Sequence, residues 1–268
     1  MSDCFTYHEG DSPLLVSVPH DGRVLPPDIA AQMTPEALAI PDTDWHVARL
    51  YEFCKQMDAS MIVATHSRYV VDLNRSMSDE ALYEGQVSTG LCPARTFGGA
   101  GIYTDGSVVP GSEKERRVGA FWRPYHEKIA HRLQQLKKRF GYALLWDAHS
   151  IPSRVPSLFP GELTELNIGT NNGSSCPPAI RTAVAGIAAS SPFSTVLDGR
   201  FRGGFITRNY GSPAQGQYAI QLELAQRCYM DEESLRYDAR RAELLVDVLQ
   251  QMLGVFVTTA AGEGSAGR

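Results

Sequence analysis

Short, almost continuously apolar runs alternate with longer segments of helical periodicity, and this alternation restricts the possible folds more than any other feature of the chain. Leu14–Val18 (LLVSV) and Tyr142–Asp147 (YALLWD) predict strands that are buried on both faces. Asp44–Met57 and Glu113–Phe140 carry apolar residues at helical spacing, and Pro124 predicts a break or kink inside the second helix. The alternation predicts an α/β fold, a three-layer sandwich with a mixed, mostly parallel central sheet and helices on both faces.

The rest of the chain fits the same pattern. Residues 76–110 are rich in glycine, serine and proline and predict a long loop over a site. A final amphipathic helix is expected over residues 233–253. We find no linker and no internal repeat, so we expect a single domain over residues 1–258, followed by a disordered tail over 259–268. Further strands are expected at 60–65, 69–73, 166–169, 205–208 and 219–224.

Composition and charge exclude several classes of partner. The formal net charge is −5 without a dense basic stripe, which disfavours a nucleic-acid partner, because phosphate binding requires clustered lysine and arginine. The N-terminus lacks the pattern of a signal peptide, and no apolar run approaches the roughly 20 residues that span a bilayer. We therefore expect no membrane association and a cytoplasmic protein. The five cysteines are scattered and form no CxxC pair, so neither a disulfide framework nor a thiolate zinc site is predicted: Cys4, Cys54, Cys92, Cys176 and Cys228.

Two histidines follow directly on predicted buried strands. His20 and His149 stand at these strand ends, and Asp44 opens a predicted helix. Two imidazoles and one carboxylate, with a fourth position left open, are the ligand pattern of catalytic zinc. A single histidine at a strand end is as often a satisfied polar group as a ligand, but the set of three is harder to explain that way. His46 is a rival ligand because it lies only two residues from Asp44. On a helix these two side chains would point about 200° apart, which indicates that only one of them is used.

Glu223 lies in the apolar strand pattern AIQLELAQ. A buried carboxylate is costly unless it has a purpose, and a carboxylate beside a metal site can act as the general base of a hydrolysis. The alternative is a solvent-facing residue, because Gln221 and Glu223 share one face of the strand by period-two alternation. The spacing leaves both interpretations open.

A basic group in the segment HSRYVVDLNRS could bind an acidic substrate. Arg68, Asn74 and Arg75 combine guanidinium groups, which bind carboxylates bidentately, with a directional amide. An internal ion pair between Asp72 and Arg75 is an equally good explanation of the pattern. Other arginines in polar loops near strand ends are weaker candidates: Arg154, Arg202 and Arg208.

Signatures of other enzyme classes are absent. The chain has no GxSxG motif, which a serine hydrolase of the α/β class would carry. It has neither GxxxxGK[ST] nor GxGxxG, so a nucleotide cofactor is not predicted. HExxH is also missing, so any metal site must use other ligand spacings.

The chain resembles the N-formylglutamate amidohydrolase family over roughly residues 12–250. The ordered motifs that carry this resemblance are SVPHDG, DTDWHVARLYEF, THSRYVVDLNRS, LYEGQ, FWRPYHEKI, LLWDAHSIPSRVP, LNIGT, RNYGSP and QLELAQRCYM. Each motif is weak by itself, and the set in this order is specific. The resemblance implies a fold like that of the zinc carboxypeptidases, with a mixed sheet between helical layers.

The resemblance also implies roles for individual residues. It implies a metal held by His20, Asp44 and His149, in the PHxG, DTDWH and DAHS motifs, and Glu223 of LELAQ as the general base. Zinc carboxypeptidases carry HxxE, whereas Arg23 stands three residues after His20, so Asp44 must replace that glutamate. The remaining implied roles concern the substrate: Asn74 and Arg75 resemble an Asn–Arg pair that binds a substrate carboxylate, and His126 of RPYHEKI lies toward the substrate or behind the site.

The function that follows is the metal-dependent hydrolysis of N-formyl-L-glutamate to formate and L-glutamate, the last step of a histidine degradation route. Zinc is the expected cofactor, although histidine and aspartate ligands also accept manganese, cobalt or iron. The expected partner is a small N-acyl amino acid dicarboxylate, bound by Arg75 with Asn74 and by one or more of Arg68, Arg154 and Arg202. The sequence leaves the oligomeric state open. Two alternatives are an amidohydrolase of another N-acyl amino acid and a non-catalytic carboxylate-binding protein.

Overall fold

A seven-stranded sheet forms the centre of the protein in a computed structural model that describes residues 3–79, 89–106 and 108–266. Its strands are β1 (Phe5–His8), β2 (Leu14–Val18), β3 (Ser60–Ala64), β4 (Ala143–Ile151), β5 (Leu166–Gly169), β6 (Thr195–Leu197) and β7 (Gln217–Ala225). The spatial order is β1-β3-β2-β4-β7-β5-β6. Strands β3, β2, β4 and β7 are mutually parallel, whereas β1 pairs antiparallel with β3 and β5 antiparallel with β7. The predicted mixed, mostly parallel sheet is confirmed.

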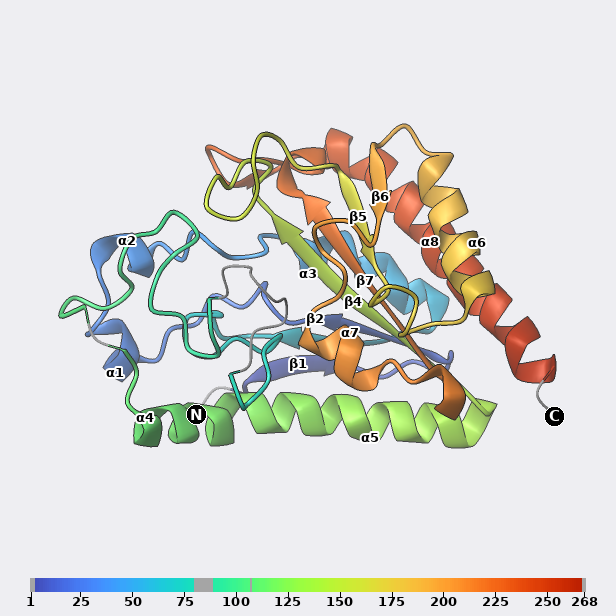
Figure 1. The fold of residues 1–268 in the computed structure, drawn as a ribbon, viewed down its shortest axis with the longest axis horizontal. Helices are drawn as coiled ribbons and strands as arrows, with labels where there is room; N and C mark the ends of the chain where they lie inside the picture. The colour runs from blue at the N-terminus through green and yellow to red at the C-terminus, as the bar shows by residue number, and fades with distance from the viewer. Residues whose placement is uncertain (1–2, 80–88, 107, 267–268) are drawn as a thin grey trace.

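Helices cover both faces of this sheet (Figure 1). Helices α4 and α5 run along one face, and α6 and α8 lie against the other, so the layers form the predicted α/β sandwich. A small two-stranded sheet joins β8 (Met230–Asp231) to β9 (Arg236–Tyr237). The helices are α1 (Pro27–Ala30), α2 (Pro35–Leu38), α3 (Val47–Leu50), α4 (Gly111–Arg117), α5 (Arg123–Phe140), α6 (Pro178–Ala189), α7 (Phe205–Tyr210) and α8 (Ala239–Ala266). Shorter turns are η1 (Glu52–Met57), η2 (Val118–Trp122), η3 (Pro213–Gln215) and η4 (Gln226–Cys228).

Burial on both faces explains the continuous apolar character of the central strands. In β2, Leu14 and Val16 pack in the cluster that includes residues of α6 and α8. Leu15, between them, packs in the second cluster with Ile129 and Leu133 of α5. Successive side chains of a strand point to opposite faces, so a strand between two helical layers must be apolar at every position.

The predicted helix Asp44–Met57 is two short pieces in the structure. His46 has a left-handed backbone with φ of 64°, which is incompatible with an α-helix that begins at Asp44. Helix α3 therefore covers only Val47–Leu50, and the 3₁₀-helix η1 follows it. The apolar spacing persists through both pieces because both bury the same face.

Two predicted strands are wrong. The segment Tyr69–Leu73 is buried but lies in turns, with Val70 N–H donating to the Ser67 carbonyl, and Tyr69 and Val70 pack in a third apolar cluster with Ile29. Phe205–Arg208 lies in helix α7. A five-residue apolar run predicts burial well, but it does not distinguish a strand from a buried turn or a short helix.

The long helical pattern ending at Phe140 contains an irregularity directly before Pro124, and not the break or kink predicted at that residue. Helix α4 passes into η2, a five-residue π-helical turn, and α5 then begins with Pro124 in its first turn. At this junction the Arg123 amide donates five residues back to the Val118 carbonyl, and this wider π-turn accommodates a proline ring that would clash with the preceding turn of a regular α-helix. The chain therefore continues in one direction through a π-turn, a common irregularity near functional sites.

Helix α8 differs from the prediction at both ends. It begins at Ala239 and extends through Ala266, so residues 259–266, predicted as a disordered tail, are helical. An 18-residue window within Ala239–Glu263 has a mean hydropathy of 1.6, so this helix is long and apolar enough to cross a membrane, which corrects the prediction that no such segment exists. The core helix of a soluble protein has the same properties, and Leu249 and Phe256 of α8 are fully buried in the main apolar cluster.

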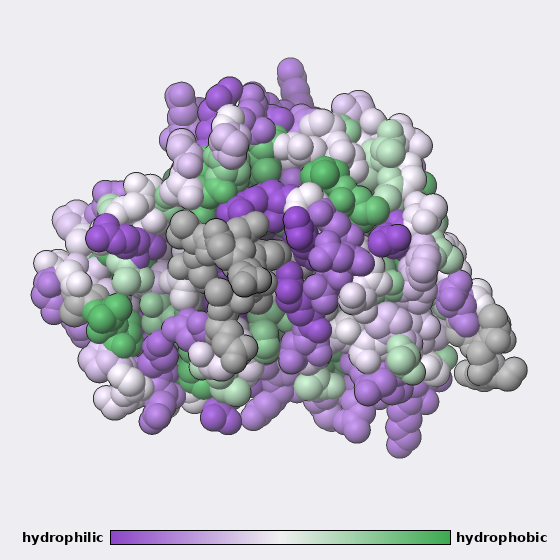
Figure 2. Space-filling view, viewed as in Figure 1, coloured by the Kyte–Doolittle hydropathy of each residue, from purple (hydrophilic) through white to green (hydrophobic). Residues whose placement is uncertain are grey.

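Of the predicted loop 76–110, the described parts contain no helix and only isolated bridges such as that between Met33 and Tyr103. The LYEGQ motif (82–86) lies outside the described residues. Figure 2 shows that hydrophilic side chains gather over the middle of the face viewed in Figure 1, with hydrophobic side chains in separate smaller groups.

Candidate active site

The parallel strands β2, β4 and β7 bring polar residues together at their carboxyl ends. On β4 and β7, Asp147, His149, Gln221 and Glu223 alternate with apolar residues and so share one face of the sheet. His20 enters the same region from the turn after β2. These strand ends border a cavity of about 100 Å³. Its lining consists of His20, Asp44, Arg68, Asn74, Arg75, Thr89, Phe97, His149, Ser150, Ile151, Leu158, Arg200, Phe201, Gly204, Gln221 and Glu223.

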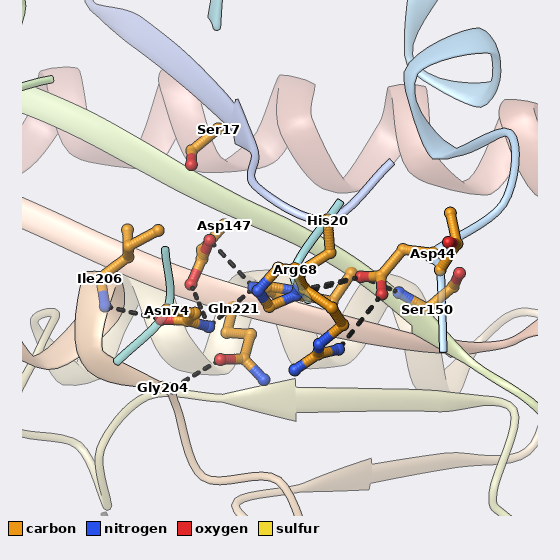
Figure 3. A network of polar contacts seen from close by, with 12 residues as sticks. Ser17, His20, Asp44, Arg68, Asn74, Asp147, Ser150, Gly204, Ile206 and Gln221 are labelled. Carbon is orange, nitrogen blue, oxygen red and sulfur yellow. Dashed lines mark hydrogen bonds and ion pairs between the residues drawn. The ribbon is translucent and has the colours of Figure 1, made fainter. Parts of the chain in front are cut away.

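The three predicted metal ligands lie together and line this cavity. One ligand atom each from His20, Asp44 and His149 can be chosen so that all lie within 4.8 Å of one another, and all three residues are buried. The Nδ1 atoms of His20 and His149 lie 3.7 Å and 3.1 Å from the same Oδ2 of Asp44. Figure 3 shows His20 and Asp44 converging from separate loops. Two imidazole nitrogens and a carboxylate oxygen around one point fit a divalent metal ion.

Carboxylates behind the two histidines fix their orientation. Asp72 Oδ1 lies 2.8 Å from Nε2 of His20, and Asp147 Oδ1 lies 3.1 Å from Nε2 of His149. A proton held on Nε2 leaves Nδ1 with a free lone pair, as a metal ligand requires. The orientation of both rings therefore fits metal binding through Nδ1.

Arg68 is an integral part of this network. Its guanidinium donates to Asp72 Oδ2 at 2.7 Å and lies 3.7 Å from Asp44 Oδ1. Among the described residues, Asp72 thus contacts Arg68 and His20, and the alternative of an Asp72–Arg75 ion pair is not what the structure contains. Arg68 still lines the cavity, so it can act on a bound molecule as a fixed cation.

The titrating groups of the site have strongly shifted pKa values. Burial disfavours the charged form of Asp44, but His20 and His149 outweigh it and hold the pKa of Asp44 well below its usual range. Burial likewise opposes the charge on His149, yet Asp147 and Asp44 raise its pKa well above the usual value. For Glu223 burial dominates and raises the pKa to about 8. A carboxyl group whose pKa lies near neutrality can both accept and release a proton.

Glu223 faces the cavity and not the solvent. The residue is 8% exposed and lines the same cavity as the metal-ligand group. It stands directly opposite His149 in the parallel register of β4 and β7. Gln221, which shares its face, is also buried at 3% exposure, so the alternative of a solvent-facing strand face is wrong.

Asn74 lines the cavity, whereas His126 lies behind its wall. The Nδ2 of Asn74 donates to Asp147 Oδ2 at 3.5 Å, and its Oδ1 accepts from the Ile206 amide at 2.8 Å, so both ends of the amide are engaged (Figure 3). His126 is buried, and its Nε2 donates to the Leu73 carbonyl at 2.8 Å. It does not line the cavity. Both residues are placed to support the segment that carries Arg75.

The predicted arginines divide into two groups. Arg75 lines the cavity, with one guanidinium nitrogen donating to the Asn74 carbonyl and another to Thr89. Arg154 has a side chain that is 66% exposed and pairs with Glu162, and neither Arg154 nor Arg202 lines the cavity. Arg200, which the sequence did not single out, does line it. Arg200 and Arg202 are alternate residues of one polar loop, and only Arg200 of the two lines the cavity.

The remaining histidines of interest are outside the metal-ligand group. The Nε2 of His46 donates to the Leu235 carbonyl at 2.9 Å, which leaves Asp44 as the residue of this pair that faces the cavity. His66 packs against the ring of Phe121, with ring centroids 4.6 Å apart. Neither histidine lines the cavity.

Comparison with known proteins identifies the family of this chain. The family model described as N-formylglutamate amidohydrolase matches residues 12–230. The chain belongs to the N-formylglutamate amidohydrolase family. An N-formylglutamate deformylase of Pseudomonas aeruginosa is 47% identical over 255 residues, which cover 94% of this chain and 96% of that protein. An N-formylglutamate deformylase of Pseudomonas putida is 44% identical over 263 residues, 97% of this chain and 98% of that protein.

Solved structures of the same fold extend over almost the whole chain. The crystal structure of an N-formylglutamate amidohydrolase from Ralstonia eutropha JMP134 superposes with a TM-score of 0.81 at 24% identity, covering 98% of this chain and 99% of that one. A gene product of Agrobacterium tumefaciens superposes with a TM-score of 0.73 at 15% identity, covering 94% and 96%. At these identities the superpositions establish the fold, and the site must be argued from its own residues.

Proposed function

We propose that this protein hydrolyses N-formyl-L-glutamate to formate and L-glutamate with the help of a divalent metal ion. One observation carries the proposal: in a chain of this family, a buried His–Asp–His group and a buried glutamate face the same small cavity. The two curated relatives are N-formylglutamate deformylases, which supports the choice of substrate. We also propose, from the family resemblance, that the reaction ends a histidine degradation route in the cytoplasm.

His20, Asp44 and His149 would hold the metal ion. Two nitrogen ligands and one oxygen ligand, with room left on the cavity side, match the donor set of catalytic zinc. When bound there, a zinc ion would polarise the formyl carbonyl and lower the pKa of a water molecule at the site. Asp72 and Asp147 keep the Nε2 atoms of the histidines protonated and so leave Nδ1 available.

Glu223 moves the proton in this proposal. Its carboxylate accepts a proton from the attacking water as oxygen adds to the formyl carbon. The same carboxyl group then delivers the proton to the amide nitrogen, the carbon–nitrogen bond breaks, and formate and L-glutamate result. The raised pKa of Glu223 suits both steps, because neither protonation state is strongly disfavoured near neutral pH.

Arg68 and Arg75 act on the charges of the substrate. Arg68 is held by Asp72 at the edge of the ligand group, where it can stabilise the negative charge that develops on the formyl oxygen. Arg75 presents a partly unpaired guanidinium to the cavity, since its buried Nε has no hydrogen-bond acceptor among the described residues. We propose that it binds the α-carboxylate of the substrate.

The test is formate release by the purified, zinc-loaded protein, with and without a chelator, from N-formyl-L-glutamate and from N-acetyl-L-glutamate. Chelator-sensitive release of formate that restores on adding zinc, with little acetate release, is the expected result. Hydrolysis of the acetyl substrate instead would assign the protein to another N-acyl amino acid. A metal-loaded protein that hydrolyses neither compound contradicts the proposal.

A further inference from the structure

Arg200 is a cation in the cavity wall whose charge no described residue balances. It lines the cavity together with Glu223 and the metal-ligand group. Its Nε is buried and has no hydrogen-bond partner in residues 3–79, 89–106 and 108–266, and no carboxylate there lies within ion-pair distance. Arg68, in contrast, is paired with Asp72. A buried guanidinium donor without an acceptor is costly, which indicates that a bound anion supplies the acceptor.

The loop that carries Arg200 is held firmly against the sheet. At its start the Asp198 carboxylate accepts from the Thr170 amide at 2.7 Å and from the Thr170 hydroxyl at 2.5 Å. At its end the Gly204 amide donates to Gln221 Oε1 at 2.6 Å. Between these points the Asn171 amide donates to the Arg202 carbonyl at 2.6 Å. A side chain on an anchored loop loses less conformational entropy when it binds a ligand than one on a free loop.

A second donor faces the cavity beside this loop. Gln221 uses its oxygen to accept from Gly204, so its Nε2 is turned away from the loop, as Figure 3 shows. Gln221 lines the cavity as Arg200 does. The guanidinium of Arg200 and the amide nitrogen of Gln221 both donate hydrogen bonds. A carboxylate, which only accepts hydrogen bonds, therefore fits between them.

We propose that Arg200, assisted by Gln221, binds the side-chain carboxylate of the substrate and thereby selects acidic over neutral N-formyl amino acids. The inference rests on the proposed function. A substrate with two carboxylates requires two cationic positions in addition to the reaction centre. Arg75 supplies one, Arg68 is committed to Asp72, and Arg200 supplies the other.

The experiment compares N-formyl-L-glutamate with N-formyl-L-glutamine, which has the same shape and a neutral side chain. The variant Arg200→Gln should lower kcat/KM for the glutamate substrate about 10- to 100-fold, mainly through KM, because a charge-assisted hydrogen bond is lost. Its kcat/KM for the glutamine substrate should change by less than about twofold. Arg200→Lys, which keeps the charge, should retain part of the preference for glutamate.

Arg202→Gln is the matched control. Arg202 lies two positions away on the same loop, its Nε donates to the Gly199 carbonyl at 3.2 Å, and it does not line the cavity. This variant should keep the wild-type preference. A calorimetric measurement of L-glutamate and L-glutamine binding gives a readout independent of turnover, and Arg200→Gln should weaken only the binding of L-glutamate.

The outcomes separate the two proposals. If wild-type protein releases no formate, the proposed function fails, whereas the calorimetric preference for L-glutamate still tests Arg200. If Arg200→Gln lowers kcat/KM equally for both substrates, or leaves their ratio unchanged, the role of Arg200 in selectivity is wrong. Circular dichroism and the retained preference of Arg200→Lys exclude misfolding as the cause of a loss.

Discussion

His149 on β4 and Glu223 on β7 are directly opposite each other in parallel register. Neighbours in register point to the same face of a sheet, so a proposed metal ligand and the proposed general base are fixed side by side by backbone hydrogen bonds. Neither residue depends on a flexible loop for its position. A substitution at Glu223 can therefore test whether proton transfer is separate from metal binding.

The variant Glu223→Gln should lower kcat on the order of 10²- to 10⁴-fold, because the amide has nearly the same shape but cannot accept the proton. Bound metal, measured by elemental analysis, should stay at the wild-type level, since Glu223 is not among the proposed ligands. Near-normal turnover would remove Glu223 as the base. Loss of the metal together with the activity would instead make Glu223 a ligand.

The hydrogen bond behind His149 should control metal affinity. Asp147 is fully buried and lies 3.1 Å from the His149 Nε2. Replacing it by asparagine should weaken metal binding about 10- to 100-fold, because the ring loses the acceptor that orients it. Competition with a chromogenic chelator measures the change. Asp44→Asn, which alters a direct ligand, should weaken binding more, and the opposite ranking would contradict the assignment of the two residues.

The sequence predicted that the two histidines of the proposed metal site lie close together, because each follows a buried strand. His20 and His149 follow parallel strands that turned out to be adjacent, and the carboxyl ends of parallel strands meet at one edge of the sheet. Asp44 was a weaker prediction, since the helix expected to begin there does not form and His46 takes a left-handed conformation. The family resemblance, and not periodicity, favoured Asp44 over His46.

What the sequence could not supply was the course of the loops. The run Tyr69–Leu73 is buried in turns, where it places Asp72 behind His20, and no strand pattern predicts that contact. Arg200 and Arg202 are alternate residues of one polar loop, and in that loop, anchored at Asp198 and at Gly204, it is Arg200 and not Arg202 that lines the cavity. Tertiary contacts determine where these loop side chains lie, and the local sequence does not predict those contacts.

Metal removal should lower the thermal stability. A ligand present at a thousand times its dissociation constant stabilises the folded state by about 4 kcal/mol, which corresponds to roughly 10 °C in Tm for a domain of this size. Scanning calorimetry with and without a chelator measures the shift. The variant His149→Ala, which lacks a proposed ligand, should show a much smaller chelator effect, and an equal effect would place the metal elsewhere.

Arg75 should contribute mainly to substrate binding. Arg75→Ala should lower kcat/KM for N-formyl-L-glutamate about 10- to 100-fold, chiefly by raising KM, because the α-carboxylate loses a charge-assisted partner. Arg154→Ala is the control, since Arg154 is exposed, pairs with Glu162 and does not line the cavity. Steady-state kinetics of the two variants distinguish them. A large effect at Arg154 with none at Arg75 would reverse the assignment.

His126 should make the protein less stable in mild acid. Burial lowers its pKa from 6.5 to about 4, so the folded protein keeps the ring neutral while the unfolded chain binds a proton below pH 6.5. The stabilising contribution is complete above the unfolded pKa and is lost as the pH falls from 6.5 toward 4, by about 2 kcal/mol between pH 7 and pH 5.

The check is urea unfolding of wild type and His126→Gln at pH 7 and pH 5. Glutamine can still donate to the Leu73 carbonyl but does not titrate, so the variant should lose about 2 kcal/mol less than wild type between the two pH values. His131→Gln, an exposed position on the same helix α5, should retain the wild-type difference. Equal pH dependence in wild type and His126→Gln would show that the ring accepts its proton in the folded state, and that its contact with the segment carrying Arg75 survives protonation.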